Sequence, residues 1–258
     1  MKILLYISFL GTNYCGYQAQ KNGNTVQQTL CAAAERVFGF PCDITGCSRT
    51  DSGVHANMFC AAVTERGREN INTSIPISKI PLAFAAVLPP DISVTSAREA
   101  DNAFHPRYDV KYKEYEYKIY NRAVPSPFWA DRSWHYPRRI DDGALGRMKD
   151  AARHFVGTHD FASYMASGSD VKDTVRTVCR ADVCREGDFV IFRVSADGFL
   201  YNMVRILTGT LVAVAEGKIS PDDIDKITAA RDRSLAGITV PAKGLYLNYV
   251  DYGDKYPS

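Results

Sequence analysis

A polar stretch bracketed by glycines separates two apolar runs that predict buried elements, and it reads Gly46-Cys47-Ser48-Arg49-Thr50-Asp51-Ser52-Gly53-Val54-His55-Ala56. Alternate residues of an extended chain point to the same face, so Arg49 and Asp51 are expected side by side. A nearby cation keeps a partly desolvated carboxylate ionised, and an ionised, fixed aspartate can act as a nucleophile or a base. The alternative is an Asx turn in which the aspartate only pairs with its neighbouring arginine. The Arg-x-Asp spacing alone does not decide between these two roles.

The whole stretch resembles the catalytic signature of the TruA family of tRNA pseudouridine synthases, and its ordered residues make the resemblance specific. Further matching segments follow in the family's order over essentially the whole chain. They are Gly11-Thr12-Asn13-Tyr14-Cys15-Gly16-Tyr17-Gln18-Ala19-Gln20, Thr25-Val26-Gln27-Gln28-Thr29-Leu30, Phe104-His105-Pro106-Arg107, Lys113-Glu114-Tyr115-Glu116-Tyr117, Pro127-Phe128, Trp134-His135, Gly157-Thr158-His159-Asp160-Phe161, Phe199-Leu200-Tyr201-Asn202-Met203-Val204-Arg205 and Gly244-Leu245-Tyr246-Leu247. The chain departs from the commonest family pattern at Ser52, where Ala is frequent, and at Asn202, where His is frequent. Neither departure affects the carboxylate, so both concern substrate contacts.

The resemblance implies that Asp51 is the catalytic nucleophile and that Arg49 and Arg205 keep it charged. Apolar neighbours of Arg205 predict a largely buried helical turn, and a buried arginine needs an anion; the alternative is a cation on a helix surface. The resemblance also implies that Tyr115 stacks near the target base and that Leu245 lines the pocket. For Tyr115 the alternative is simple core packing, because Tyr117 shares its strand face.

Pseudouridine formation breaks the bond from ribose to N1 of uracil, turns the base and rejoins it through C5. No metal or other cofactor is therefore expected. Two routes stay open at this point: Asp51 adds covalently to the ribose or the base, or it removes a sugar proton to give a glycal.

The composition predicts a globular protein, with 258 residues of which 46% are hydrophobic and 23% charged. Such a chain can form one large domain or two compact ones. The apolar N-terminus, residues 1–9, is too short to span a bilayer and lacks a signal-cleavage pattern, so we interpret it as a strand. No membrane segment is found, and a cytoplasmic location is expected. The seven cysteines are scattered and lack zinc-ribbon spacing, so reduced thiols are expected.

Basic residues are concentrated in one region of a chain whose net charge is only +2. Residues 1–105 hold 8 basic and 8 acidic side chains, whereas residues 106–153 hold 11 basic and 7 acidic ones. Aromatic side chains lie among these cations, a mixture typical of phosphate attraction beside base stacking, although a tyrosine-rich core strand gives the same pattern. They are Tyr108, Tyr112, Tyr115, Tyr117, Tyr120, Phe128, Trp129 and Trp134.

Periodicity and cap signals predict a β-α-β-β-α-β order in the N-terminal half. The expected elements are a strand at 2–9, a helix from the capping box Thr25–Gln28 to Gly39, strands at 42–48 and 57–64, a helix at 77–87 and a strand at 92–98. The C-terminal half is expected to repeat this theme with longer insertions. Its elements are a strand at 111–120, a helix at 142–155, strands at 174–184 and 188–195, a helix at 203–216, a short helix with Ser220 as its N-cap and a strand at 245–252.

These patterns predict an α+β fold of two ferredoxin-like (RRM-like) units that share one core. The division is expected near residues 104–110, giving an N-terminal half, 1–105, with the catalytic loop and a C-terminal half, 106–258, with Tyr115 and Arg205. The resemblance implies a continuous mixed, mostly antiparallel sheet with a central cleft between the halves.

The histidines show no H-x-x-x-H spacing within a helix, which again predicts no metal site. His55 and His159 match family positions, and we expect them to orient loops by hydrogen bonds.

The leading function is therefore an RNA-modifying isomerase that acts on uridines 38, 39 and 40 of the tRNA anticodon arm, as the resemblance implies. Three adjacent targets favour recognition of RNA shape and backbone. Family members act as homodimers, so tRNA and a second copy are the expected partners. Two alternatives stay open: a non-catalytic RNA-binding or chaperone protein of the same fold, and a synthase for another RNA site. An unrelated carboxylate-dependent hydrolase lacks a second carboxylate or a metal cluster at convincing spacing.

Overall fold

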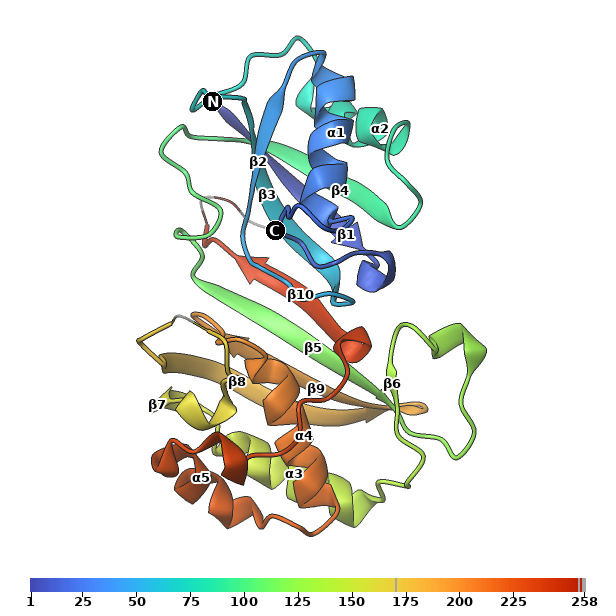
Figure 1. Cartoon of the computed structure of the whole chain (residues 1–258), viewed down its shortest axis with the longest axis vertical. Coiled ribbons are helices and arrows are strands. Elements are labelled where there is room, and N and C mark those ends of the chain that lie inside the picture. The colour runs from blue at the N-terminus through green and yellow to red at the C-terminus, as the bar shows by residue number, and fades with distance from the viewer. Residues whose placement is uncertain (170, 255, 257–258) are drawn as a thin grey trace. The chain divides into compact units, whose positions relative to one another are not determined.

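The computed structural model describes residues 1–169, 171–254 and 256, and its chain divides into two compact units (Figure 1). The first unit contains Met1–Lys111 and the described residues from Tyr246 onward, and the second contains Tyr112–Leu245. The second unit is therefore inserted in the sequence of the first.

The first unit is a sheet with two helices packed side by side (Figure 1). Its elements are β1 (Lys2–Phe9), α1 (Val26–Phe38), β2 (Cys42–Gly46), β3 (His55–Glu65), α2 (Ile80–Ala85), β4 (Ile92–Ala100) and β10 (Leu245–Asp251). The strand order is β4-β1-β3-β10. β3 pairs with β1 along one edge, and its other edge pairs with β2 at residues 61–65 and with β10 at residues 55–56. This long strand thus organises the unit.

Local sequence signals account for the boundaries of α1. Thr25 caps the helix, because its side chain accepts a hydrogen bond from the Gln28 backbone N–H at 3.3 Å. Gly39 ends the helix with φ of +80°, a left-handed conformation that glycine adopts without strain. Both features confirm the sequence prediction for this helix.

The second unit is a predominantly antiparallel sheet with helices. Its elements are β5 (Tyr112–Tyr120), β6 (Trp134–His135), α3 (Asp142–Arg153), β7 (Gly157–Asp160), β8 (Val175–Glu186), β9 (Phe189–Ala196), α4 (Met203–Ala215) and α5 (Ile224–Ala230). The strand order is β5-β9-β8-β7, and β6 adds two parallel pairs at the end of β5. Most residues of α4 are buried, and α4 packs against α3. A buried face this wide makes α4 the central helix of the unit.

The predicted α+β class with mostly antiparallel strands is confirmed, and so is the β-α-β-β-α-β order of the N-terminal half. The short strands β6 and β7 were not expected, since two to four residues carry too little periodicity. Ser220 was expected to cap the following helix, but its side chain makes no cap hydrogen bond there. The central cleft stays a prediction.

The observed division differs from the expected one, which placed all of residues 106–258 in the second half. Residues from Tyr246 onward group with the first unit because the main chain of β10 pairs with β3, Tyr246 opposite His55 and Leu247 opposite Ala56. A parallel pairing between residues so distant in sequence leaves no local signal. No helix in the described part of the chain combines the length and apolarity that crossing a membrane requires.

Candidate active site

The signature stretch forms the loop between β2 and β3, and Asp51 begins a tight turn within it. The Val54 backbone N–H donates to the Asp51 carbonyl oxygen at 3.2 Å. Gly53 is the third residue of this turn and has φ of +78°, which L side chains rarely adopt. Asp51 itself is half-buried. A glycine at position 53 is therefore needed for the turn that presents Asp51.

The segment Gly11–Tyr17 holds this loop on both sides of Asp51, and we call it the clamp segment. Before Asp51, the Tyr17 N–H donates to the Thr50 carbonyl oxygen at 3.1 Å. After Asp51, the Ser52 hydroxyl donates to the Tyr14 carbonyl oxygen at 3.1 Å, and the Gly11 N–H donates to Nδ1 of His55 at 2.9 Å. These contacts fix the main chain on which the aspartate sits.

Two glycines allow the clamp segment to come this close to the loop. A Cβ atom at Gly11 would lie 1.9 Å from the Val54 carbonyl oxygen, and one at Gly16 would lie 2.6 Å from the Thr50 carbonyl oxygen. Gly16 also has φ of +86°. Larger residues at either position would push the loop away.

Aromatic packing also supports the Asp51 loop. The Tyr17 ring stacks on Phe59 with centroids 4.3 Å apart, and a Cβ atom at Gly46 would lie 2.5 Å from the Tyr17 ring. Burial raises the pKa of Tyr17 well above its usual value, so the phenol is neutral. Within the described residues, the buried Tyr17 hydroxyl and Thr50 Oγ1 make no hydrogen bond.

His55 is buried at the start of β3 and joins three parts of the first unit. Its Nδ1 accepts the Gly11 N–H, and its ring lies against Tyr246 of β10, with centroids 4.7 Å apart. Because a backbone N–H can only donate, Nδ1 carries no proton in this arrangement. The hydrogen bond agrees with the orienting role expected from the sequence.

Arg49 does not pair with Asp51 as an extended chain would predict. Arg49 is exposed and forms no hydrogen bond or ion pair with any residue that the structure describes. The chain from Ser48 to Asp51 is irregular, so the alternation of strand faces does not apply to it.

The second unit carries the other predicted site residues. Tyr115 lies on β5, is 6% exposed, and meets Phe199 edge to face with centroids 5.0 Å apart. Leu245 is buried at the start of β10, after Gly244, where a Cβ atom would lie 2.6 Å from the Tyr117 ring. The predicted residues thus fall on both units, Arg49 and Asp51 on the first and Tyr115, Arg205 and Leu245 on the second.

Arg205 lies in the first turn of α4, and its partners include two neutral acceptors of its own unit. Its Nε donates to the Val240 carbonyl oxygen at 2.7 Å, and its Nη1 donates to Oδ1 of Asn202 at 2.5 Å. Asn202 precedes the helix with φ of +59°, a left-handed conformation that asparagine tolerates. The Arg205 side chain is half-buried, and the apolar neighbours in its turn, Met203, Val204, Ile206 and Leu207, are buried as predicted. The sequence did not predict that Asn202 orients Arg205, although it showed that Asn202 departs from the family pattern.

His159 contributes a local contact in the second unit. Its Nε2 lies 3.0 Å from the Val156 carbonyl oxygen, and its ring packs edge to face on Phe161. Both contacts span only a few residues, so the histidine orders the chain around its own strand, β7.

The predicted aromatic set of residues 106–153 divides into core and surface members. Tyr115 and Tyr117 are buried, and the Tyr117 hydroxyl donates to the Pro241 carbonyl oxygen at 2.6 Å. Tyr108 and Phe128 are 76% and 77% exposed. Core packing therefore explains part of the tyrosine pattern and leaves few rings for stacking on RNA.

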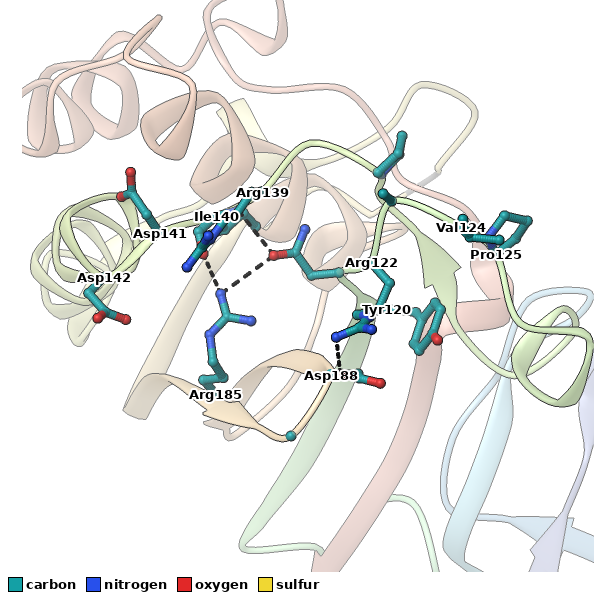
Figure 2. A pocket seen from close by; sticks show the side chains of 14 residues that line it. Tyr120, Arg122, Val124, Pro125, Arg139, Ile140, Asp141, Asp142, Arg185 and Asp188 are labelled. Atoms are coloured by element: carbon teal, nitrogen blue, oxygen red, sulfur yellow. Dashed lines mark hydrogen bonds and ion pairs between the residues drawn. The ribbon is translucent and has the colours of Figure 1, made fainter.

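A pocket of about 760 Å³ in the second unit contains none of the predicted site residues (Figure 2). Asp188 pairs with Arg122 at 3.3 Å across it, and Nη2 of Arg185 donates to the Ile140 carbonyl oxygen. Arginines and aspartates both line this pocket, so it favours neither anions nor cations. Among the described residues, no three His, Cys, Asp or Glu side chains gather as a metal site.

Comparison with known proteins gives a consistent result over most of the chain. A family model described as tRNA pseudouridine synthase matches residues 5–109 and 151–253. Proteins named tRNA pseudouridine synthase A are similar along nearly their whole length: 42% identity over 252 residues in Thermoanaerobacter sp. strain X514 and 43% over 251 residues in Acetivibrio thermocellus. Each alignment covers 97% of this chain and 99% of the relative. A relative in Bacillus licheniformis is 42% identical over 98% of this chain and 99% of its own.

Proposed function

Because the chain belongs to the tRNA pseudouridine synthase family, we propose that it isomerises uridine to pseudouridine at positions 38, 39 and 40 in the anticodon arm of tRNA. The observation that carries this proposal is the turn at Asp51, which the clamp segment holds from both flanks. A single fixed carboxylate suits a reaction that moves one glycosidic bond from N1 to C5 without net oxidation.

In this proposal Asp51 is the nucleophile, Arg205 stabilises its negative charge, and Arg49 binds the substrate. Arg49 is exposed in the first unit and makes no contact within the described residues, so its guanidinium is available for substrate. Asn202 and Val240 orient Arg205. Tyr115 supplies an aromatic ring for the extruded base, and Leu245 adds apolar surface to the pocket.

The proposal extends to partners and location. We expect the enzyme to act on tRNA in the cytoplasm as a homodimer. The basic excess of residues 106–153 supports binding of the tRNA backbone, since each neutralised phosphate releases counterions.

The test is site mapping of pseudouridine in unmodified tRNA after incubation with purified protein, without added metal or cofactor. Wild type is expected to form pseudouridine in the anticodon arm, whereas Asp51→Ala forms none. Arg205→Leu is expected to retain the fold and lose most activity. Asp43→Ala is the matched control, because Asp43 is an exposed carboxylate of the same unit, paired with Arg66 at 3.6 Å.

Product from Asp51→Ala would refute the assigned nucleophile. Tight tRNA binding by wild type without any product would instead favour a non-catalytic RNA-binding protein. Product at another position would keep the reaction and change the site.

A further inference from the structure

Tyr108 is unusual among the tyrosines of this chain because it is held in a fixed position and yet left open to solvent. It lies in the turn after Phe104, in the first unit, and is 76% exposed. Burying such a ring against another surface would remove apolar area from water. A single exposed ring needs no explanation by itself, so the argument rests on how this one is held.

Hydrogen bonds fix the turn that carries Tyr108. The Tyr108 and Asp109 N–H groups donate to the His105 carbonyl oxygen at 3.2 and 3.1 Å. The His105 N–H in turn donates to Oδ2 of Asp109 at 2.9 Å, and the Arg107 N–H donates to Nδ1 of His105 at 3.1 Å. A turn ordered before binding loses little conformational entropy when a partner arrives.

The turn is also anchored to the core of its unit. Phe104 is buried and packs on Tyr252 and Tyr256, with centroids 5.1 and 4.6 Å away. The Tyr252 hydroxyl donates to the Pro106 carbonyl oxygen at 2.7 Å. The ring of Tyr108 therefore stands on a rigid base.

One face of Tyr108 is already stacked. The His105 ring lies against it with centroids 4.2 Å apart and an interplanar angle of 28°. The high exposure of Tyr108 leaves its opposite face to solvent. A third flat ring could extend the stack on that face, as nucleic-acid bases do on protein aromatic rings.

Two cations, Lys2 and Arg107, and one anion, Asp109, lie near this stack. Burial lowers the pKa of His105, the charges of Lys2 and Arg107 lower it further, and Asp109 acts in the opposite direction. His105 is thus neutral near pH 7, which suits ring stacking, while Lys2 and Arg107 remain as charges that attract phosphate. Isolated aromatic surface beside cations fits a nucleotide better than an apolar protein face.

We propose that the free face of Tyr108 stacks on an unpaired base of the tRNA substrate, with His105 as its backing ring. This inference rests on the proposed function for the identity of the RNA. The base that stacks on Tyr108 is not the uridine that reacts at Asp51, because the proposed function assigns the reacting uridine to Tyr115.

The test is equilibrium binding of unmodified tRNA to Tyr108 variants, together with turnover at saturating tRNA. Tyr108→Ala is expected to raise Kd about 5- to 100-fold, the range for loss of one base–aromatic stack. Turnover at saturation stays at the wild-type value. Tyr108→Phe and Tyr108→Trp are expected to restore binding, because both keep a flat ring.

Leu82→Ala is the matched control, since Leu82 is a large side chain of α2 in the same unit and is 65% exposed. Its tRNA affinity is expected to equal that of wild type. Unchanged affinity in Tyr108→Ala, or failure of Tyr108→Trp to restore it, would overturn the stacking role. The proposed function fails separately, when wild type binds tRNA and forms no pseudouridine.

Discussion

In the part of the chain that the structure describes, two hydroxyl groups are buried without a hydrogen bond: the phenol of Tyr17 in the clamp segment and Oγ1 of Thr50 in the Asp51 loop. A buried polar group without a partner costs about 1–3 kcal/mol of stability. Tyr17 is kept for its ring, which stacks on Phe59 and fits against Gly46. Burial of its hydroxyl costs stability and gains no hydrogen bond within the described residues.

Replacement of Tyr17 by Phe is therefore expected to raise the free energy of unfolding by about 1 kcal/mol. Urea unfolding followed by circular dichroism measures this change. Tyr117→Phe is the matched control, because the buried Tyr117 hydroxyl donates to Pro241 at 2.6 Å and its loss should destabilise by about 1 kcal/mol. Equal destabilisation by both substitutions would show that Tyr17 also has a partner, such as a buried water.

At this scale the sequence identifies residue types better than their contacts. The signature pattern singles out Asp51 and Arg49, but the expected side-by-side pairing does not form, because a loop does not follow strand alternation. The hydrogen bond from Gly11 to His55 joins residues 44 positions apart, and no local pattern predicts such a partner.

At the scale of elements, the clamp segment accounts for the position of the Asp51 loop. It contains one short 3₁₀ turn, Gly11–Asn13, and otherwise follows the loop in irregular conformation. Its contacts are made mainly by the backbone, so its function depends on the absence of side chains at Gly11 and Gly16 more than on any side chain present.

Gly16→Ala is expected to displace the loop, because its Cβ would lie 2.6 Å from the Thr50 carbonyl oxygen and φ is +86°. The single-turnover rate should fall at least about tenfold, since a 1 Å misplacement of reacting groups costs about two orders of magnitude. Affinity for tRNA should remain unchanged. Single-turnover kinetics with parallel binding measurements separate the two effects.

Gly67→Ala provides the control for backbone strain. Gly67 has a similar φ of +77°, but no atom lies within 4 Å of its Cβ position. We expect it to lose about 1 kcal/mol of stability and to keep the wild-type rate. If Gly16→Ala and Gly67→Ala had equal single-turnover rates, this result would contradict the role of the clamp segment in positioning Asp51.

Elements with strong local signals were predictable, and those without were not. Thr25 and Gly39 mark α1 through a cap and a left-handed end. α4 begins after Asn202 without a side-chain cap, but its apolar run predicted a helix at 203–216, close to the observed Met203–Ala215. Strands β6 and β7, in contrast, are too short for a period to be read. Tertiary packing, rather than local propensity, determines these boundaries.

At the scale of the whole molecule, the pairing partner of β10 could not be predicted from the sequence. Its alternation predicts a strand, but only the structure shows that it pairs with β3 and completes the first unit. Leu247 and Val250 are fully buried there, and Tyr246 packs on His55. The unit that carries Asp51 therefore depends on residues from both ends of the described chain.

A chain shortened to residues 1–244 is expected to lose the native state of the first unit. Without β10, residues 55–56 of β3 lose their pairing and His55 loses the ring that covers it. Hydrogen exchange should show rapid loss of protection in β3, while β9 keeps protection between β5 and β8. The shortened chain should form no pseudouridine. Full protection of β3 would contradict the dependence on β10.

This discontinuity has a consequence during synthesis on the ribosome. β3 ends at Glu65 and β10 begins at Leu245, so roughly 180 residues are translated between the two partners. At a translation rate of about 5–20 residues per second, roughly 10 to 35 s pass between the synthesis of β3 and that of its pairing partner β10. The nascent chain therefore exposes an open strand edge that calls for chaperone protection. Catalytic competence is therefore expected only after β10 has been translated, so chains that terminate before Leu245 should be inactive.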